Sequence, residues 1–135
     1  MECVCDFEEK LDQFLRNHNG HFDNGVLRFV NSFIKFSVYT QSMLVDGVAT
    51  RTVCFDSVEV PIQYRGMGIF STYLGILQAY GNEYKRMTGV QNIVNTGLMA
   101  HVNELGYTKM KDYSSDTVLY ADDALQRAAQ FDYSF

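Results

Sequence analysis

The sequence contains no tryptophan, one proline and three cysteines in 135 residues. An odd number of cysteines, with Cys3 and Cys5 too close for an ordinary bridge, argues against a disulfide-stabilised secreted domain. No segment approaches the roughly 20 consecutive apolar residues that span a bilayer. The acidic start, MECVCDFEEK, lacks the basic and apolar regions of a signal peptide. We therefore expect a cytoplasmic protein in a reducing compartment, with no membrane partner.

Basic residues are also scarce. Lysine and arginine number 11 against 16 aspartates and glutamates, which gives a net charge of −5. The basic residues do not cluster, so the cationic footprint that neutralises phosphates in nucleic-acid-binding proteins is missing. The composition predicts no nucleic-acid partner, and an acidic surface tolerates a cationic substrate such as an amine.

The sequence is rich in residues that form a hydrophobic core. Hydrophobic residues make up 47% of the sequence and aromatic residues 14%, mostly tyrosine and phenylalanine. This composition favours a packed domain over a disordered chain. Dividing 135 residues into two domains would leave each half short of core, so we expect one domain over residues 1–135.

The first segment predicts a helix. Asp6 followed by Glu9 is typical of a capping box, and Asn19-Gly20 supplies a stop signal. Apolar residues recur at helical spacing between these signals. They are Val4, Phe7, Leu11, Phe14 and Leu15.

Residues 26–60 predict strands. Ile34, Phe36 and Val38 alternate with polar or half-polar residues, which is the period of a strand. Asp46-Gly47 between two such runs suits a tight hairpin turn. We expect an antiparallel meander of about three strands.

The second half of the chain contains apolar residues at both helical and strand spacing. An apolar stripe at helical spacing and several short β runs alternate with glycine punctuation. We expect helices at 69–86, 98–105 and 122–130, and strands at 90–94, 107–111 and 117–121, with Ser114 and Ser115 in the last turn. This order predicts an α/β fold with a mixed, mostly antiparallel central sheet flanked by helices.

The segment 58–69 carries the strongest chemical signal, because a strand runs through a loop with two glycines directly into a helix. Gly66 and Gly68 allow close approach of backbone N–H groups, and a helix amino terminus attracts pyrophosphate. Arg65 offers a charge-assisted contact. A Walker loop is excluded because no Gly-Lys-Ser/Thr occurs, and a dinucleotide loop because Ser71 stands where its third glycine belongs.

Gln63-Tyr64-Arg65-Gly66-Met67-Gly68 resembles the acetyl-CoA loop of the GNAT superfamily, whose pattern is Gln or Arg, two residues, Gly, one residue, then Gly or Ala. A second match follows at the expected distance, where the family has Asn, an apolar helix and Leu-Gly-Phe. Its residues are Asn95, Leu98, Met99, Ala100, Leu105, Gly106 and Tyr107, with Tyr107 replacing Phe. Together the resemblance covers about Val48 to Tyr120.

The resemblance implies a GNAT-like sheet that is splayed at its central strands and an N-acetyltransferase that uses acetyl-CoA without a metal. A primary amine, on a small molecule or a protein, would attack the thioester directly. Backbone groups near Val58 and Val60 would bind the pantetheine arm. The loop residues Gln63, Tyr64, Arg65, Gly66, Met67 and Gly68 would bind the pyrophosphate.

Other polar residues have two interpretations each. Glu59, on the strand before the loop, is the expected general base, since burial there would strengthen it as a base, with Asp56 as substitute. Its valine neighbours equally suit a solvent-facing residue. Asn95 either orients the cofactor or caps a helix. Ser71 either reaches a phosphate or is solvated.

One position departs from the family. Many members have a proton-donating tyrosine four residues before the glycine that ends the helix, on the face that lines the cofactor channel, and this position is Val102. His101 is adjacent but about 100° around the helix. Two functions stay open: an active N-acetyltransferase, or a catalytically impaired GNAT-fold protein that binds CoA or a protein partner.

The remaining signals are a set of cysteines and histidines and an aromatic carboxyl-terminal end. Cys3, Cys5, His18 and His21 have a spacing unlike known structural zinc sites, so we expect no metal. The aromatic end, residues 131–135, packs on its own domain or contributes to a homodimer.

Overall fold

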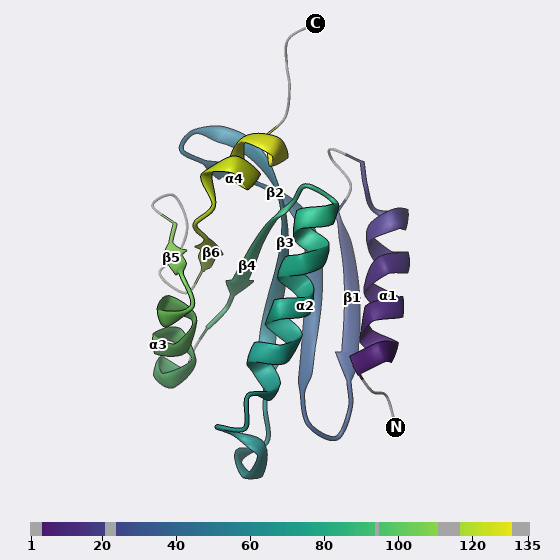
Figure 1. Cartoon of the computed structure of the whole chain (residues 1–135), viewed down its shortest axis with the longest axis vertical. Helices are drawn as coiled ribbons and strands as arrows, with labels where there is room; N and C mark the ends of the chain where they lie inside the picture. The colour runs from purple at the N-terminus through teal and green to yellow at the C-terminus, as the bar shows by residue number, and fades with distance from the viewer. Residues whose placement is uncertain (1–3, 21–23, 94, 111–116, 131–135) are drawn as a thin grey trace, which may run out of the picture.

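The computed structural model describes residues 4–20, 24–93, 95–110 and 117–130 (Figure 1). Its helices are α1 (Val4–Asn17), η1 (a short 3-10 turn, Ile62–Tyr64), α2 (Ile69–Glu83), α3 (Thr96–Glu104) and α4 (Asp123–Ala129). Its strands are β1 (Gly25–Val30), β2 (Lys35–Val45), β3 (Val48–Glu59), β4 (Met87–Gln91), β5 (Tyr107–Lys109) and β6 (Val118–Tyr120). Among these described helices, none combines the length and apolarity needed to cross a membrane.

The strands form one sheet of six in the order β1-β2-β3-β4-β6-β5. β3 pairs with β4 in parallel, and the other described strand pairs are antiparallel. A parallel neighbour requires a crossover, which α2 provides. The mixed, mostly antiparallel sheet predicted from the sequence is confirmed, including the three-stranded meander β1-β2-β3.

The main core lies between the sheet and three helices. Phe7 of α1 has its ring 5.2 Å from that of Phe29, 5.1 Å from Phe36 and 5.3 Å from Tyr73, which joins α1 to β1, β2 and α2. α2 lies between α1 and α3 on this face (Figure 1). Edge and tilted aromatic pairs contribute about 0.5–1.5 kcal/mol each beyond their buried area.

α4 covers the opposite face of the sheet. Successive side chains of a strand point to opposite faces, so Cys54 lies on the face away from Phe55. Cys54 packs in a second apolar cluster with Met87, Leu125 and Ala129. Asp122 accepts a hydrogen bond from Leu125 N at 3.0 Å, which caps α4.

The two central strands separate at one end of the sheet. The pairing of β3 with β4 ends at Asp56 and Gln91, whereas β3 continues to Glu59. The register of β2 against β3 shifts beside Ser57, whose φ of 54° marks an irregular position in the strand. The splay implied by the GNAT resemblance is therefore present.

The Asp46-Gly47 hairpin signal and the glycine that ends α3 are confirmed. Asp46 and Gly47 both have positive φ, 51° and 77°, as a tight hairpin turn requires. Gly106 has a φ of 97° directly after the last turn of α3. Both features follow from short-range backbone chemistry.

Two boundaries differ from the prediction. α1 extends to Val4, so Asp6 lies in its first turn, and the capping-box interpretation is wrong. β4 begins at Met87 because the left-handed Lys85, with φ of 57°, ends the preceding helix early. Gly89 therefore lies inside β4 and does not precede it. A Cβ at this position would meet Leu119 and the sulfur of Cys54.

Some predictions fall outside the described residues. These are the serine turn at 114 and 115, the aromatic end at 131–135, and the candidate metal ligands Cys3 and His21.

Candidate functional site

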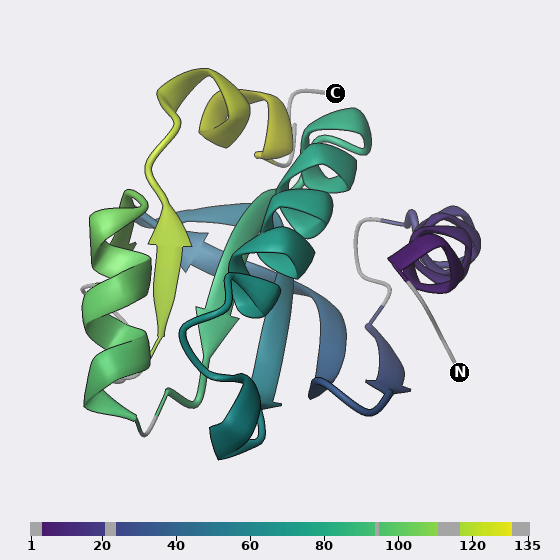
Figure 2. The same ribbon diagram turned by 60° about the horizontal axis from the view of Figure 1, so that its bottom comes forward.

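A cleft opens where β3 and β4 separate. Its volume is about 710 Å³. The end of β3, the loop before α2, the first turn of α2 and the start of α3 lie at the same end of the sheet (Figure 2). The cleft is lined by Val58, Glu59, Val60, Tyr64, Arg65, Gly66, Gly68, Ile69, Phe70, Ser71, Asn95, Gly97, Leu98 and His101.

The loop before α2 presents backbone donors to this cleft. Gly66 and Gly68 have φ of 81° and 76°, a region that residues with side chains rarely adopt. A Cβ at either position would meet nothing within 4 Å, so the space in front of the loop is open. Gly68 is the N-cap of α2 and has no side-chain acceptor, which leaves the first N–H groups of the helix available to an anion.

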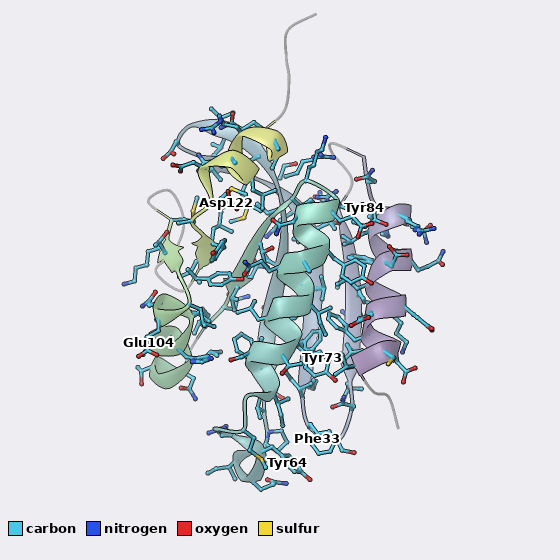
Figure 3. The ribbon with its side chains drawn as sticks, viewed as in Figure 1. Phe33, Tyr64, Tyr73, Tyr84, Glu104 and Asp122 are labelled. Carbon is cyan, nitrogen blue, oxygen red and sulfur yellow. The ribbon has the colours of Figure 1, made fainter. Side chains whose placement is uncertain are left out.

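The loop is held in place from both sides. Arg65 Nε donates to the carbonyl oxygen of Val60 at 2.9 Å, which ties the loop to the end of β3. The ring of Tyr64 packs edge-on against Phe33 from the β1–β2 turn, with centroids 4.8 Å apart (Figure 3). Asn31 shapes that turn by accepting from the N–H groups of Phe33 and Ile34 at 2.8 and 3.0 Å. The backbone geometry of this loop is therefore fixed by contacts from both sides.

The structure brings most of the predicted cofactor residues together. Residues from β3, the loop, α2 and α3 line the same cleft, as the sequence predicts. Gln63 and Met67 are exceptions, since both are exposed and neither lines it. Asn95 serves one predicted role directly, because its Oδ1 accepts from Leu98 N at 3.1 Å and caps α3, and it also lines the cleft.

The two candidate bases have different environments. Glu59 lines the cleft at the end of β3 but is exposed, so the burial expected there is not found. Asp56 is buried, with 8% of its surface exposed. Its Oδ1 accepts from Ser57 Oγ and Asn92 Nδ2, both at 2.8 Å, and its Oδ2 from Gln91 Nε2 at 3.2 Å. These bonds make Asp56 a structural part of the point where β3 and β4 separate, which we call the strand fork.

Val102 does not face the cleft. Its side chain is fully buried in the core between α3 and the sheet, contrary to the position inferred from the family register. Leu98 and His101, three residues apart on α3, line the cleft instead. Sequence reasoning missed His101 as a cleft residue, although its spacing from Leu98 was readable.

His101 contacts the first turn of α2. Its Nε2 lies 2.6 Å from Ser71 Oγ, a hydrogen-bonding distance, and its ring lies 6.3 Å from that of Phe70. Both Ser71 and His101 are half-buried. The cleft therefore contains a serine–histidine pair that joins its two helices.

Metal ligands do not gather in the described part of the chain. Residues 4–20, 24–93, 95–110 and 117–130 contain no group of three or more histidine, cysteine, aspartate or glutamate side chains close enough to hold an ion.

Comparisons with known sequences give no match. No protein-family model matches this sequence, and no curated protein matches it.

Solved structures do match in fold. A mutant of the toxin AtaT bound to its antitoxin AtaR and acetyl-CoA aligns with a TM-score of 0.54 and 8% identity over 70% of this chain, which spans only 62% of that AtaT chain. AtaT complexed with acetyl-methionyl-tRNAfMet aligns with a TM-score of 0.55 and 10% identity, over 88% of this chain and 85% of that one. The KacTA–DNA complex gives 0.52 and 15%, over 88% and 83%.

AtaT and KacT have the GNAT fold, so these similarities confirm the fold predicted from the sequence. Identities this low establish the fold alone.

Proposed function

We propose that this chain, which has the GNAT fold, is an acetyl-CoA-dependent N-acetyltransferase that acetylates a primary amine by direct attack. The observation that carries the proposal is the glycine loop at the amino end of α2, which opens onto a cleft of about 710 Å³ at the strand fork. A phosphate-binding loop and an acyl-transfer site would then lie side by side.

The residues present fit acetyl-CoA. Gly66, Gly68 and the first turn of α2 would bind the pyrophosphate through backbone N–H groups, with Arg65 adding positive charge at the exposed rim. Beyond Asp56, the backbone of β3 no longer pairs with β4, so Val58 and Val60 would bind the amides of the pantetheine arm. Acetyl-CoA supplies the activated acyl group.

The chain's own residues would handle the amine. The fork between β3 and β4 would give an acceptor access to the thioester. Glu59 lines the cleft and is the proposed general base that takes a proton from the attacking amine. Its exposure also allows the proton to leave to solvent.

The class of acceptor is an amine. The acidic surface, with a net charge of −5, favours a small cationic amine or a basic peptide. The structural neighbours, however, include an AtaT complex with acetyl-methionyl-tRNAfMet and a KacTA complex with DNA. They give no support to the composition-based prediction that nucleic acid is excluded, so an aminoacyl-tRNA belongs among the amines tested.

Val102 supports a second candidate function. Its side chain is buried and has no acidic proton, so the position of the family's proton-donating tyrosine is empty of a donor. The alternative is therefore a CoA-binding or protein-interaction module without turnover.

Acetyl-CoA titration followed by a thiol-release assay tests the proposal. We expect acetyl-CoA at 100 times its Kd to stabilise the native protein by about 2.7 kcal/mol. We expect thiol release with at least one of a polyamine, a lysine-containing peptide and methionyl-tRNA. Binding without release from any of them supports the alternative. No binding at millimolar acetyl-CoA contradicts the acetyltransferase function and a CoA-binding module, and leaves only a protein-interaction module.

A further inference from the structure

Acyl transfer from a thioester leaves a thiolate, which departs more easily when an acid protonates it. Val102 cannot supply that proton, because it is apolar and its side chain is fully buried. The donor therefore has to come from another side chain that reaches the cleft or from water.

Few of the described residues that line the cleft carry an exchangeable side-chain proton. Arg65 is a poor donor, since a guanidinium stays protonated at any physiological pH. Glu59 is the proposed base. Tyr64 packs against Phe33 at the outer turn. Asn95 caps α3, and its amide is too weak an acid to protonate a thiolate. His101 and Ser71 are left, and histidine is the side chain suited to giving and regaining a proton near neutral pH.

The contact between Ser71 and His101 indicates which ring nitrogen would donate the proton. Ser71 Oγ lies 2.6 Å from His101 Nε2, so the hydroxyl oxygen can accept from Nε2–H. With Nε2 as the donor, that bond holds the ring against the first turn of α2 and leaves Nδ1 as the nitrogen that can pass on a proton.

We propose that His101 is the general acid of the transfer reaction and that Ser71 is its positioning residue. The inference rests on the proposed acetyltransferase function. The amine nitrogen bonds to the carbonyl carbon, the carbon–sulfur bond breaks, and its electron pair leaves on sulfur. His101 gives its Nδ1 proton to that sulfur, which yields the thiol and a neutral imidazole. The amine's proton passes through Glu59 to solvent, and solvent reprotonates His101.

Steady-state kinetics and CoA titration of matched variants test this role. His101→Gln keeps a polar side chain of similar reach but cannot act as an acid, so we expect kcat to fall about 100-fold. The Kd for CoA should stay within about twofold. Glu104→Gln is the control, because Glu104 is an exposed residue of the same helix. It should keep the wild-type kcat.

Ser71 variants test the positioning role. Ser71→Ala should lower kcat by about tenfold or less, the effect of one lost hydrogen bond, without raising KM. Ser71→Thr retains a hydroxyl and should restore most of the rate. A loss of kcat that Ser71→Thr does not reverse would contradict positioning through the hydroxyl.

Two results overturn the proposal while leaving the acetyltransferase function intact. They are an unchanged kcat in His101→Gln, whether or not the Kd for CoA weakens, and a loss of kcat in Tyr64→Phe as large as that expected for His101→Gln. If His101→Gln proves unstable, His101→Asn is measured by the same criteria. Wild-type protein with no turnover on any amine of the panel overturns both proposals together.

Discussion

The side-chain amide of Asn92 donates a hydrogen bond to Asp56 Oδ1 at 2.8 Å across the point where β3 and β4 separate. Asn92 has a φ of 56°, a conformation that asparagine tolerates better than most residues. Gln91 donates to the other carboxylate oxygen and accepts from Gln41 at 2.8 Å, which extends the network to β2. A buried carboxylate thus joins the two strands at the point where they begin to separate.

Asp56→Asn tests this network. The amide would point an N–H group at donors that now face a carboxylate, and an unsatisfied buried donor costs about 1–3 kcal/mol. We expect urea unfolding to show a loss of stability of that size. Glu59→Gln, an exposed change three residues further along the same strand, should stay within about 0.5 kcal/mol of wild type. Equal stabilities for the two variants would show that Asp56 does not hold the fork.

Gly68→Ala tests the phosphate loop against a matched glycine. Gly68 and Gly47 have φ of 76° and 77°, and a Cβ at either meets nothing within 4 Å. The backbone cost of alanine is therefore similar at both, about 1–2 kcal/mol. We expect only Gly68→Ala to weaken acetyl-CoA binding, by tenfold or more in titration calorimetry, because its Cβ enters the space in front of the helix terminus. Equal affinities of the two variants would place the cofactor elsewhere.

Val102→Tyr distinguishes a core position from a catalytic one. Val102 is fully buried, so a tyrosine there overpacks the core and should cost about 1–3 kcal/mol in denaturant unfolding. Turnover should not rise in the folded fraction, because the added hydroxyl does not point into the cleft. A stable variant with a higher kcat would show that this face of α3 reaches the thioester.

Alkaline pH should destabilise the fold through Cys54. Burial raises the pKa of its thiol to about 11. The raised pKa contributes stability that is complete below pH 9 and is lost as pH rises through 11, by about 2 kcal/mol. Cys54→Ala should lack this component when unfolding free energies at pH 8 and pH 11 are compared. The same pH dependence in both proteins would contradict the assignment.

Tyr107 adds to the loss at higher pH in both proteins, since burial raises the pKa of its phenol as well. The comparison of wild type with Cys54→Ala therefore isolates the thiol.

Local chemistry explains what the sequence could predict. The Gly66–Gly68 loop, the Asp46-Gly47 hairpin and the Asn95 cap depend on residues close together in the chain, and each is confirmed. His101 could not be assigned in this way. Whether it or Val102 faces the cleft depends on how α3 rotates against α2 and the sheet, which long-range packing decides.

The strand boundaries show the same limit. Ser57 and Lys85 adopt positive φ without being glycine, so no residue type marks them. Ser57 is held at the fork by its bond to Asp56, and Lys85 lies at the end of α2. Sequence patterns therefore placed β4 three residues too late and gave no sign of the irregularity in β3.

The parallel pairing of β3 with β4 also has a kinetic consequence. Antiparallel neighbours such as β2 and β3 meet through a short turn, whereas β3 and β4 are joined by the crossover helix α2. Non-local contacts of this kind form slowly, because the closure of a long loop precedes any gain from pairing. The fork is made by this pairing, so the chain acquires its cleft late in folding, and recovery of acetyl-CoA affinity during refolding should lag behind formation of the β1-β2-β3 meander.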